Sequence, residues 1–289
     1  MSLLGREEYV EQAYFFRVLR EWIDQNVPVQ EVLLSVREEV LVTTKLPMAI
    51  DFLVGELQLR GRIGDGMSRL KHYFTEFQAF IMRAAEDERS KLDFRIALQI
   101  LEKEADYLSQ NEMNLAALFM YHFECVARNR LGYDEGMLAI AEHPAYPEAW
   151  RSWIGRIRFE LGTVDFSDLV YVRSEQHVAD VAQRRREPDY QPAYAVLFDR
   201  QAGRIAKANH GKDPLYMFAA LHRQLGYPAV PRPKPKSTAP LFDPPVENRF
   251  QRLESRVALL EQEQRGGLDL TSFYKKTELD SDEGSRNPE

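Results

Sequence analysis

The sequence holds a single cysteine, Cys125, in 289 residues. One cysteine forms no disulfide within its own chain, and an unpaired thiol is typical of proteins in a reducing compartment. The first residues lack the basic segment and apolar core of a secretion signal. No apolar run approaches the roughly 20 residues that cross a bilayer. We therefore expect a cytoplasmic protein with no membrane partner.

The chain also lacks an excess of basic over acidic residues. The net charge is -7 at pH 7, and acidic residues outnumber basic ones both up to Tyr227 and after it. The densest basic cluster, Arg184 to Arg186, has acidic residues nearby. Nucleic-acid-binding proteins usually gather lysine and arginine on one surface. We therefore expect no nucleic-acid partner.

The sequence motifs of several enzyme classes are missing. There is no Gly-x-x-x-x-Gly-Lys phosphate loop, no Gly-x-Gly-x-x-Gly and no Gly-x-Ser-x-Gly nucleophile turn. The chain contains neither His-Glu-x-x-His nor Glu-x-x-His, the helical spacings of zinc and di-iron sites. The sequence therefore predicts no catalytic residue, no cofactor and no metal site, and it favours a protein that is not an enzyme.

Two histidine pairs nevertheless have the spacing of one helix face. His122 and Cys125 are three residues apart in a strongly apolar segment, and His72 and Glu76 are four apart. A catalytic nucleophile and its base usually come from separate elements, and buried cysteine packs as a small apolar side chain. We therefore expect the first pair to lie in the core. The second lacks the further ligands that zinc needs, so we expect it to be solvated.

Apolar residues recur at three- and four-residue steps through residues 1–228, which predicts an all-α globular domain. The clearest stripe runs over 70–84. Further helices are expected over 6–25, 32–40, from Pro47 onward, and over 92–108, 113–131, 146–161, 165–185 and 214–225. About 8–10 helices would form either an irregular bundle or an array of helix pairs.

A leucine-glycine pair occurs where three of these helices end, at Leu131, Leu161 and Leu225. Glycine accepts the left-handed conformation that closes a helix, so ordinary helix ends explain the motif. Its recurrence also leaves open a degenerate repeat of helix pairs, as in a short tetratricopeptide-like adaptor.

The segment 197–207 interrupts the helical pattern. Short apolar runs flank a polar turn with Gly203, which predicts one small β-hairpin. The stretch that follows leads to a helix N-terminus at Asp213-Pro214, and helix N-termini attract anions. A ligand site in the body would therefore be expected here, and its candidate residues are Arg204, Lys207, His210 and Lys212.

The chain beyond Pro228 differs from the body in composition, since it begins with a run of prolines and ends in acidic and polar residues. We predict a proline-rich linker over 229–245, a coiled-coil-like helix over 246–265 and a disordered end over 266–289. Residues predicted to oligomerise or dock are the apolar positions of this tail. They are Val246, Phe250, Leu253, Val257, Leu260, Phe273 and Tyr274.

Two stretches resemble parts of bacterial proteins described only as hypothetical. They are MSLLGREEYVEQAYFFR at 1–17 and DPLYMFAALHRQLGYP at 213–228. The resemblance implies a bacterial, cytoplasmic origin and carries no activity, ligand or fold with it.

Taken together, these features favour a non-catalytic interaction or scaffold protein. Its partner would be another protein or a second copy, bound through the tail helix. Two alternatives stay open at this point: an enzyme or small-ligand-binding helical protein whose site is assembled from dispersed residues, and the helical-repeat adaptor.

Overall fold

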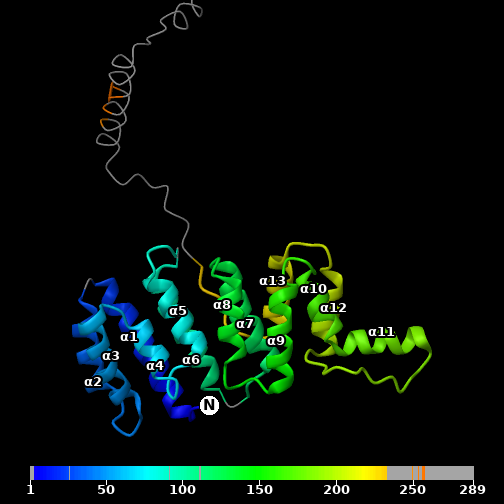
Figure 1. The fold of residues 1–289 in the computed structure, drawn as a ribbon, viewed down its shortest axis with the longest axis horizontal. Coiled ribbons are helices and arrows are strands. Elements are labelled where there is room, and N and C mark those ends of the chain that lie inside the picture. Colours follow the sequence, from blue (N-terminus) through cyan, green and yellow to red (C-terminus); the bar gives the residue numbers. More distant parts are fainter. Residues whose placement is uncertain are drawn as a thin grey trace, which may run out of the picture. The chain divides into compact units, whose positions relative to one another are not determined.

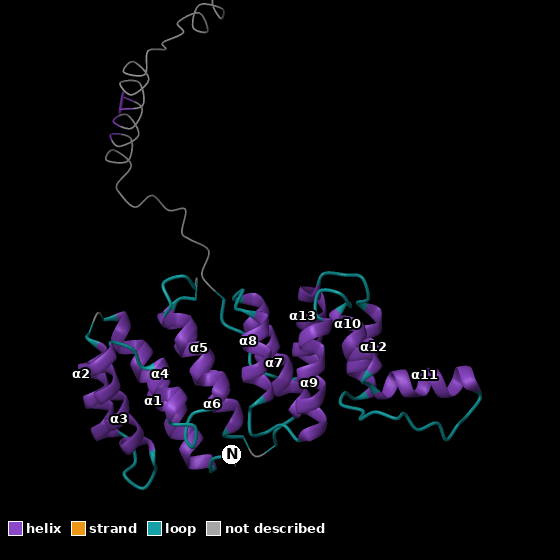
Figure 2. Cartoon of the chain, viewed as in Figure 1, coloured by secondary structure: helices purple, strands orange, loops and turns teal. Residues whose placement is uncertain are grey.

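The structure is a computed structural model, which describes residues 3–25, 27–90, 92–110, 112–232 and four tail positions, 249, 253, 256 and 257. The chain divides into two units, 1–233 (the body) and 234–289 (the tail). Thirteen helices and no strand occur in the described part of the body. Figure 2 draws this part as helices joined by loops. The helices are α1 (Arg6–Asp24), α2 (Val29–Glu39), α3 (Leu46–Arg60), α4 (Gly64–Arg69), α5 (Glu76–Glu86), α6 (Phe94–Leu108), α7 (Leu115–Arg128), α8 (Tyr133–Ala141), α9 (Glu148–Glu160), α10 (Phe166–Val172), α11 (Glu175–Arg185), α12 (Arg200–Ala208) and α13 (Pro214–Leu225).

The ends of these helices follow from local sequence. Thr75 begins α5 with a capping box, in which its hydroxyl accepts from Gln78 N and the Gln78 side chain accepts from Thr75 N. Asp213 caps α13, and Pro214 occupies its first position. Gly226 ends that helix with φ 69°, the left-handed conformation predicted for it.

The body is a row of helices that begins with α2 and α3 and ends with α11 (Figure 1). Its packing does not follow chain order, because α1 packs most extensively against α6, and α7 packs against α13. Stacked repeats contact only their sequence neighbours. The body is therefore an irregular multi-helix bundle, the first of the two predicted architectures.

Three predictions about individual elements were wrong. The stripe 70–84 is not one helix, because α4 ends at Arg69 and the Thr75 cap starts α5. Residues 165–185 divide into α10 and α11 because the Ser174 hydroxyl accepts from His177 N and starts a new helix. The predicted β-hairpin at 197–207 is α12, which is capped by Asp199.

Gly203 explains the error in the hairpin prediction. Glycine in a polar segment is typical of a turn, yet Gly203 lies inside α12, where it allows close packing. A Cβ atom at this position would stand 2.5 Å from Ser174 Cβ and 2.8 Å from Gln176 Cβ. The glycine therefore serves contact between α12 and the start of α11.

Among the residues that the structure describes, the buried members of the hydrophobic core fall between Tyr9 and Val230. Phe119 on α7 occupies the centre of an aromatic cluster, with its ring centroid 4.9 Å from Trp153 and 5.7 Å from Trp150. The packing continues past Tyr227, because Val230 is buried and Ala229 O accepts a hydrogen bond from Lys103 Nζ at 2.7 Å. The body therefore contains a hydrophobic core of its own.

No described helix is long and apolar enough to cross a membrane. Of the tail residues predicted to oligomerise or dock, the structure describes Leu253 and Val257. The remaining ones, Val246, Phe250, Leu260, Phe273 and Tyr274, lie outside the described residues, as do most of the linker and the predicted disordered end.

Helix α11 buries no residue and projects from the end of the row (Figure 1). Its main polar attachment is Asp180, whose carboxylate accepts from Tyr171 OH at 2.6 Å and pairs with Lys207 Nζ at 2.5 Å. The hydrogen bonds from Lys207 and Tyr171 lower the pKa of Asp180 to about 2. An aspartate with a depressed pKa stabilises the folded state above its ordinary pKa of about 3.9, and this contribution is lost as the pH falls towards 2.

We expect Asp180→Asn to loosen α11. Hydrogen exchange should show lower amide protection across α11 in the variant at pH 7, and the difference from wild type should shrink as the pH falls from about 4 towards 2. Asp189→Asn, at an exposed position on the segment after α11, is the control and should leave protection unchanged. Equal protection in Asp180→Asn and wild type at pH 7 would show that other contacts hold the helix.

Candidate functional site

The most unusual group of polar side chains in the described part of the body lies inside the core. Glu104 comes from α6, His122 from α7 and His143 from the loop between α8 and α9. All three side chains are fully buried, and each directs one nitrogen or oxygen atom to a common point, with these atoms within 4.8 Å of one another. We call these residues the buried triad.

His122 links two partners through its two ring nitrogens. Nε2 lies 2.7 Å from Glu104 Oε1, and Nδ1 lies 3.1 Å from Tyr146 OH. The ring also packs against Phe77, with centroids 4.1 Å apart. Contacts on both nitrogens and on the ring face hold the imidazole in one orientation.

His143 is less completely paired. Its Nδ1 accepts a hydrogen bond from Ala145 N at 3.2 Å, so in the neutral ring the proton resides on Nε2. That Nε2 lies 3.8 Å from Glu104 Oε1, too far for a hydrogen bond. Glu104 Oε2 and His143 Nε2 are both buried without a partner in hydrogen-bond geometry, although the Gln78 side chain lies close enough to Glu104 to lower the pKa of its carboxyl. Buried polar atoms are nearly always paired in folded proteins, and these two are among seven buried side-chain atoms without a hydrogen-bond partner in the described residues.

Burial dominates the electrostatics of the triad. It raises the pKa of Glu104 to about 7, an effect that the nearby His143 partly opposes. Burial lowers the pKa of His122 to about 3 and that of His143 to about 3. Removal from water disfavours the charged form of each group. At neutral pH both imidazoles are therefore uncharged.

Two sequence-based expectations involve this region. His122 is indeed a core residue, as expected, but its polar contacts are to Glu104 and Tyr146. Cys125 is buried as well, and burial raises the pKa of its thiol well above the ordinary value. A thiol held in its neutral form is a poor nucleophile, so the structure gives the His122 and Cys125 pair no catalytic arrangement.

The other histidine pair is not on one helix. His72 is exposed in the turn before α5, whereas Glu76 is the first residue of α5 and pairs with Arg83 at 2.9 Å. His72 is solvated, as expected.

The candidate ligand residues near α12 face separate partners. Lys207 pairs with Asp180, His210 Nδ1 lies 2.8 Å from Asp168 Oδ1, and Lys212 Nζ donates to Ala208 O at 2.8 Å. Arg204 lies exposed on α12. The structure therefore brings these residues onto one region of the surface without directing them to one point.

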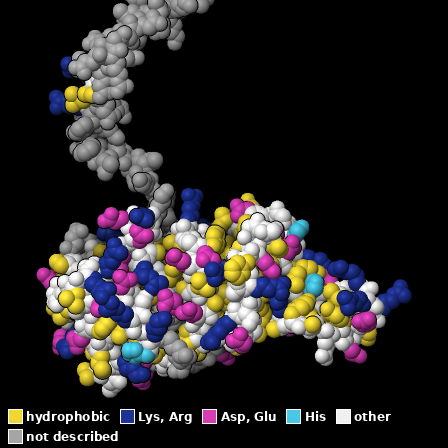
Figure 3. All heavy atoms as spheres, in the orientation of Figure 1, with side chains coloured by type: hydrophobic (Ala, Val, Ile, Leu, Met, Phe, Trp, Pro, Cys, Tyr) yellow, Lys and Arg dark blue, Asp and Glu magenta, His cyan; other side chains and the backbone are white. Residues whose placement is uncertain are grey.

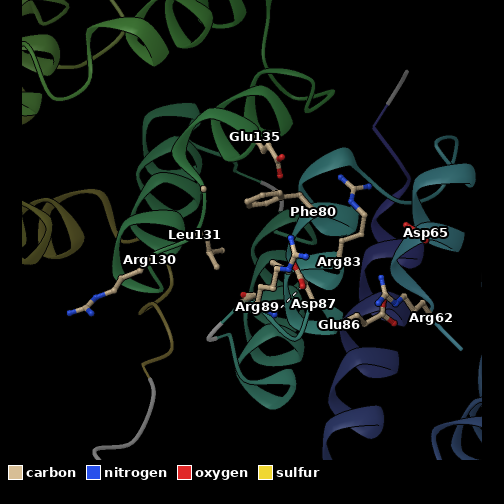
Figure 4. Close-up of a pocket in the computed structure, with 13 residues that line it drawn as sticks. Arg62, Asp65, Phe80, Arg83, Glu86, Asp87, Arg89, Arg130, Leu131 and Glu135 are labelled. Atoms are coloured by element: carbon tan, nitrogen blue, oxygen red, sulfur yellow. Dashed lines mark hydrogen bonds between the residues drawn. The ribbon is translucent and has the colours of Figure 1, made fainter.

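A cleft of about 710 Å³ lies between α4, α5 and the start of α8 (Figure 4). Phe80 and Leu131 line it together with four arginines and four acidic residues, so the cleft carries no net charge. The carboxylate of Glu86 is engaged by the backbone, since it accepts from Ile63 N at 2.6 Å and Gly64 N at 2.9 Å. Arg130 points away from the other labelled arginines in Figure 4. Arg130 therefore does not share a site with the other three arginines.

One helix has an unexpected apolar surface. Met48, Phe52 and Leu59 follow each other along the outer face of α3, with exposed fractions of 76%, 37% and 81%. The opposite face of α3 is buried in the core. Helix α3 therefore carries apolar side chains on its exposed face as well as on its buried one, although exposed Asp51 and Gln58 also belong to the helix. On the face of the body drawn in Figure 3, acidic and basic side chains otherwise intermingle.

Comparisons of the chain with protein-family models, with curated proteins and with solved structures found no match.

Proposed function

We propose that this protein is a non-catalytic interaction protein that forms a homodimer through its tail helix and so presents two helical bodies together. The observation that carries the proposal is the apolar stripe of the tail, on which Leu253 and Val257 are helical and have exposed fractions of 54% and 52%. A helix of this length is only marginally stable alone in water. Burying these side chains against a second helix supplies the missing stabilisation.

The spacing and charge of the tail favour a second copy of the same chain as the partner. Apolar residues at 246, 250, 253, 257 and 260 repeat in steps of four and three, the seam of a coiled coil. Arg249 and Arg256 then fall at g positions, and Glu254 and Glu261 at e positions. In a parallel pair each arginine meets a glutamate of the other chain, whereas an antiparallel pair would bring like charges together. The pattern therefore favours a parallel homodimer.

The body supports a role in binding rather than in chemistry. The buried triad is the arrangement closest to a catalytic group, yet all three side chains are sealed from solvent. A general acid or base must come within hydrogen-bonding distance of a substrate. The apolar outer face of α3, by contrast, is a surface of the kind that proteins use to contact one another.

A charge exchange tests the pairing. Arg249→Glu with Arg256→Glu makes both charged positions acidic, and Glu254→Arg with Glu261→Arg makes both basic. We expect each double variant to be monomeric by light scattering, because either homodimer places like charges opposite each other. An equimolar mixture of the two should recover a dimer, since every cross-chain pair is then attractive.

Wild-type protein and the exposed-surface variant Asp189→Asn serve as controls and should both be dimeric. A monomeric wild type would overturn the proposal, as would two double variants that keep the wild-type mass. If each double variant dimerises alone and the mixture shows no preference for mixed pairs, some other surface holds the chains together.

A further inference from the structure

We infer that the buried triad of Glu104, His122 and His143 is a binding site for one divalent first-row transition-metal ion. The inference is independent of the tail and of the proposed dimer. Two imidazole nitrogens and one carboxylate are ligands that zinc and iron(II) commonly take from proteins.

The positions of the ligand atoms suit such an ion. Glu104 Oε1 lies 2.7 Å from His122 Nε2 and 3.8 Å from His143 Nε2, and all three atoms lie within 4.8 Å of one another. Bonds of about 2.0–2.1 Å in tetrahedral geometry hold ligand atoms roughly 3.3 Å apart. Shifts of about an ångström in the side chains therefore convert the present arrangement into a coordination sphere. Three separate elements supply the ligands, so the ion would join α6, α7 and the loop after α8.

The unpaired atoms give an independent reason for an ion. Glu104 Oε2 and His143 Nε2 are buried without a partner in hydrogen-bond geometry, the Gln78 side chain being the nearest polar group that acts on Glu104, and both atoms belong to the triad. A buried carboxylate without full pairing is costly, whereas a cation at the same point compensates its charge. Glu104 can offer Oε2 as a further ligand atom, and a water molecule is the usual alternative in sites with three protein ligands.

The surroundings of His122 are consistent with coordination through Nε2, whereas His143 must change its tautomer to coordinate in the same way. His122 Nδ1 lies 3.1 Å from Tyr146 OH, and a proton on Nδ1 directed to that oxygen leaves Nε2 free for the metal. For His143, coordination requires the ring proton to move from Nε2 to Nδ1. The Ala145 N–H contact of 3.2 Å is then given up. Both rings stay neutral, and Glu104 binds as a carboxylate.

Full burial determines how the site is tested. Because the triad is closed to solvent, the ion enters as the chain folds. The full chain is therefore unfolded in denaturant with a chelator, refolded with Zn²⁺ or with Mg²⁺, freed of loose metal and assayed for bound metal. We expect one zinc per chain and no magnesium, which prefers oxygen ligands in octahedral geometry. The zinc-refolded protein should also melt at a higher temperature, since the ion binds only the folded state.

Conservative variants localise the ion. Glu104→Gln keeps the size of the side chain, and His143→Asn keeps an acceptor for Ala145 N–H. Each should lose the bound zinc. His210→Asn, which alters the exposed His210 and Asp168 pair, should retain it. Refolded wild type without zinc would overturn the inference even if a variant fails to fold. Zinc retained by both triad variants would equally overturn it, because the ion would then bind elsewhere.

Discussion

His122→Ala is expected to destabilise the folded body by about 3–5 kcal/mol, measured by denaturant unfolding in the presence of a chelator. The change removes a fully buried ring that packs against Phe77 and leaves a cavity in its place. It also deprives Glu104 Oε1 and Tyr146 OH of their hydrogen-bond partner. Cavity formation and an unpaired buried carboxyl group act in the same direction. The chelator ensures that no bound metal contributes to the difference.

His72→Ala is the matched control for this prediction. His72 is an exposed turn residue, and exposed substitutions usually change stability by less than about 0.5 kcal/mol. A loss below about 1 kcal/mol for His122→Ala would mean that the core rearranges around the missing ring. The contacts of the triad would then contribute little to the stability of the folded body.

Gly203→Ala should destabilise the body by about 2–3 kcal/mol, although alanine is the better helix former. The added methyl group would collide with Ser174, whose Cβ lies 2.5 Å from the position of the new atom. Ser174 cannot easily move aside, because its hydroxyl donates to Tyr171 O and accepts from His177 N at the start of α11. Helix α12 must therefore shift away from its neighbour.

Gly155→Ala, also within a helix, is expected to increase the stability of the protein. Gly155 lies inside α9, and a Cβ atom there meets no other atom within 4 Å. Without a steric cost, the gain in helix propensity should stabilise the protein by about 0.5–1 kcal/mol. Equal changes in the free energy of unfolding for Gly203→Ala and Gly155→Ala, measured by chemical denaturation, would show that α12 does not pack closely against Ser174.

The sequence predicts most helices of the body because their apolar stripes and caps are local features. The helix 6–25 corresponds to α1, and the Asp213 and Gly226 signals mark both ends of α13. The predictions of one helix over 70–84 and of a hairpin over 197–207 were wrong because the same local pattern is compatible with two structures. Thr75 interrupts a continuous apolar stripe through a capping box, and Gly203 serves packing rather than a turn. Apolar periodicity alone predicts neither feature. The break before α5 depends on the single cap residue Thr75, and the packing of Gly203 depends on Ser174, the cap residue of α11.

The buried triad could not be found by spacing. Glu104, His122 and His143 belong to three separate elements and are far apart along the chain. Helical spacing relates only residues three or four apart, so sequence reasoning paired His122 with Cys125. The contact of His122 with Glu104 depends on how separate elements pack. The sequence nevertheless contains a local indication of the site. Glu104 and His122 lie on strongly apolar helix faces, where a polar side chain requires a polar partner.

The measurement that tests the proposed function most directly is the solution mass of the full chain and of a chain ending at Arg232. The shorter chain retains every buried core residue among those that the structure describes, so it should fold. We expect about twice the mass of one 33.6 kDa chain for the full protein and a monomer for the shorter one. A full chain that stays monomeric at all concentrations, or a shorter chain that is equally dimeric, would contradict this expectation.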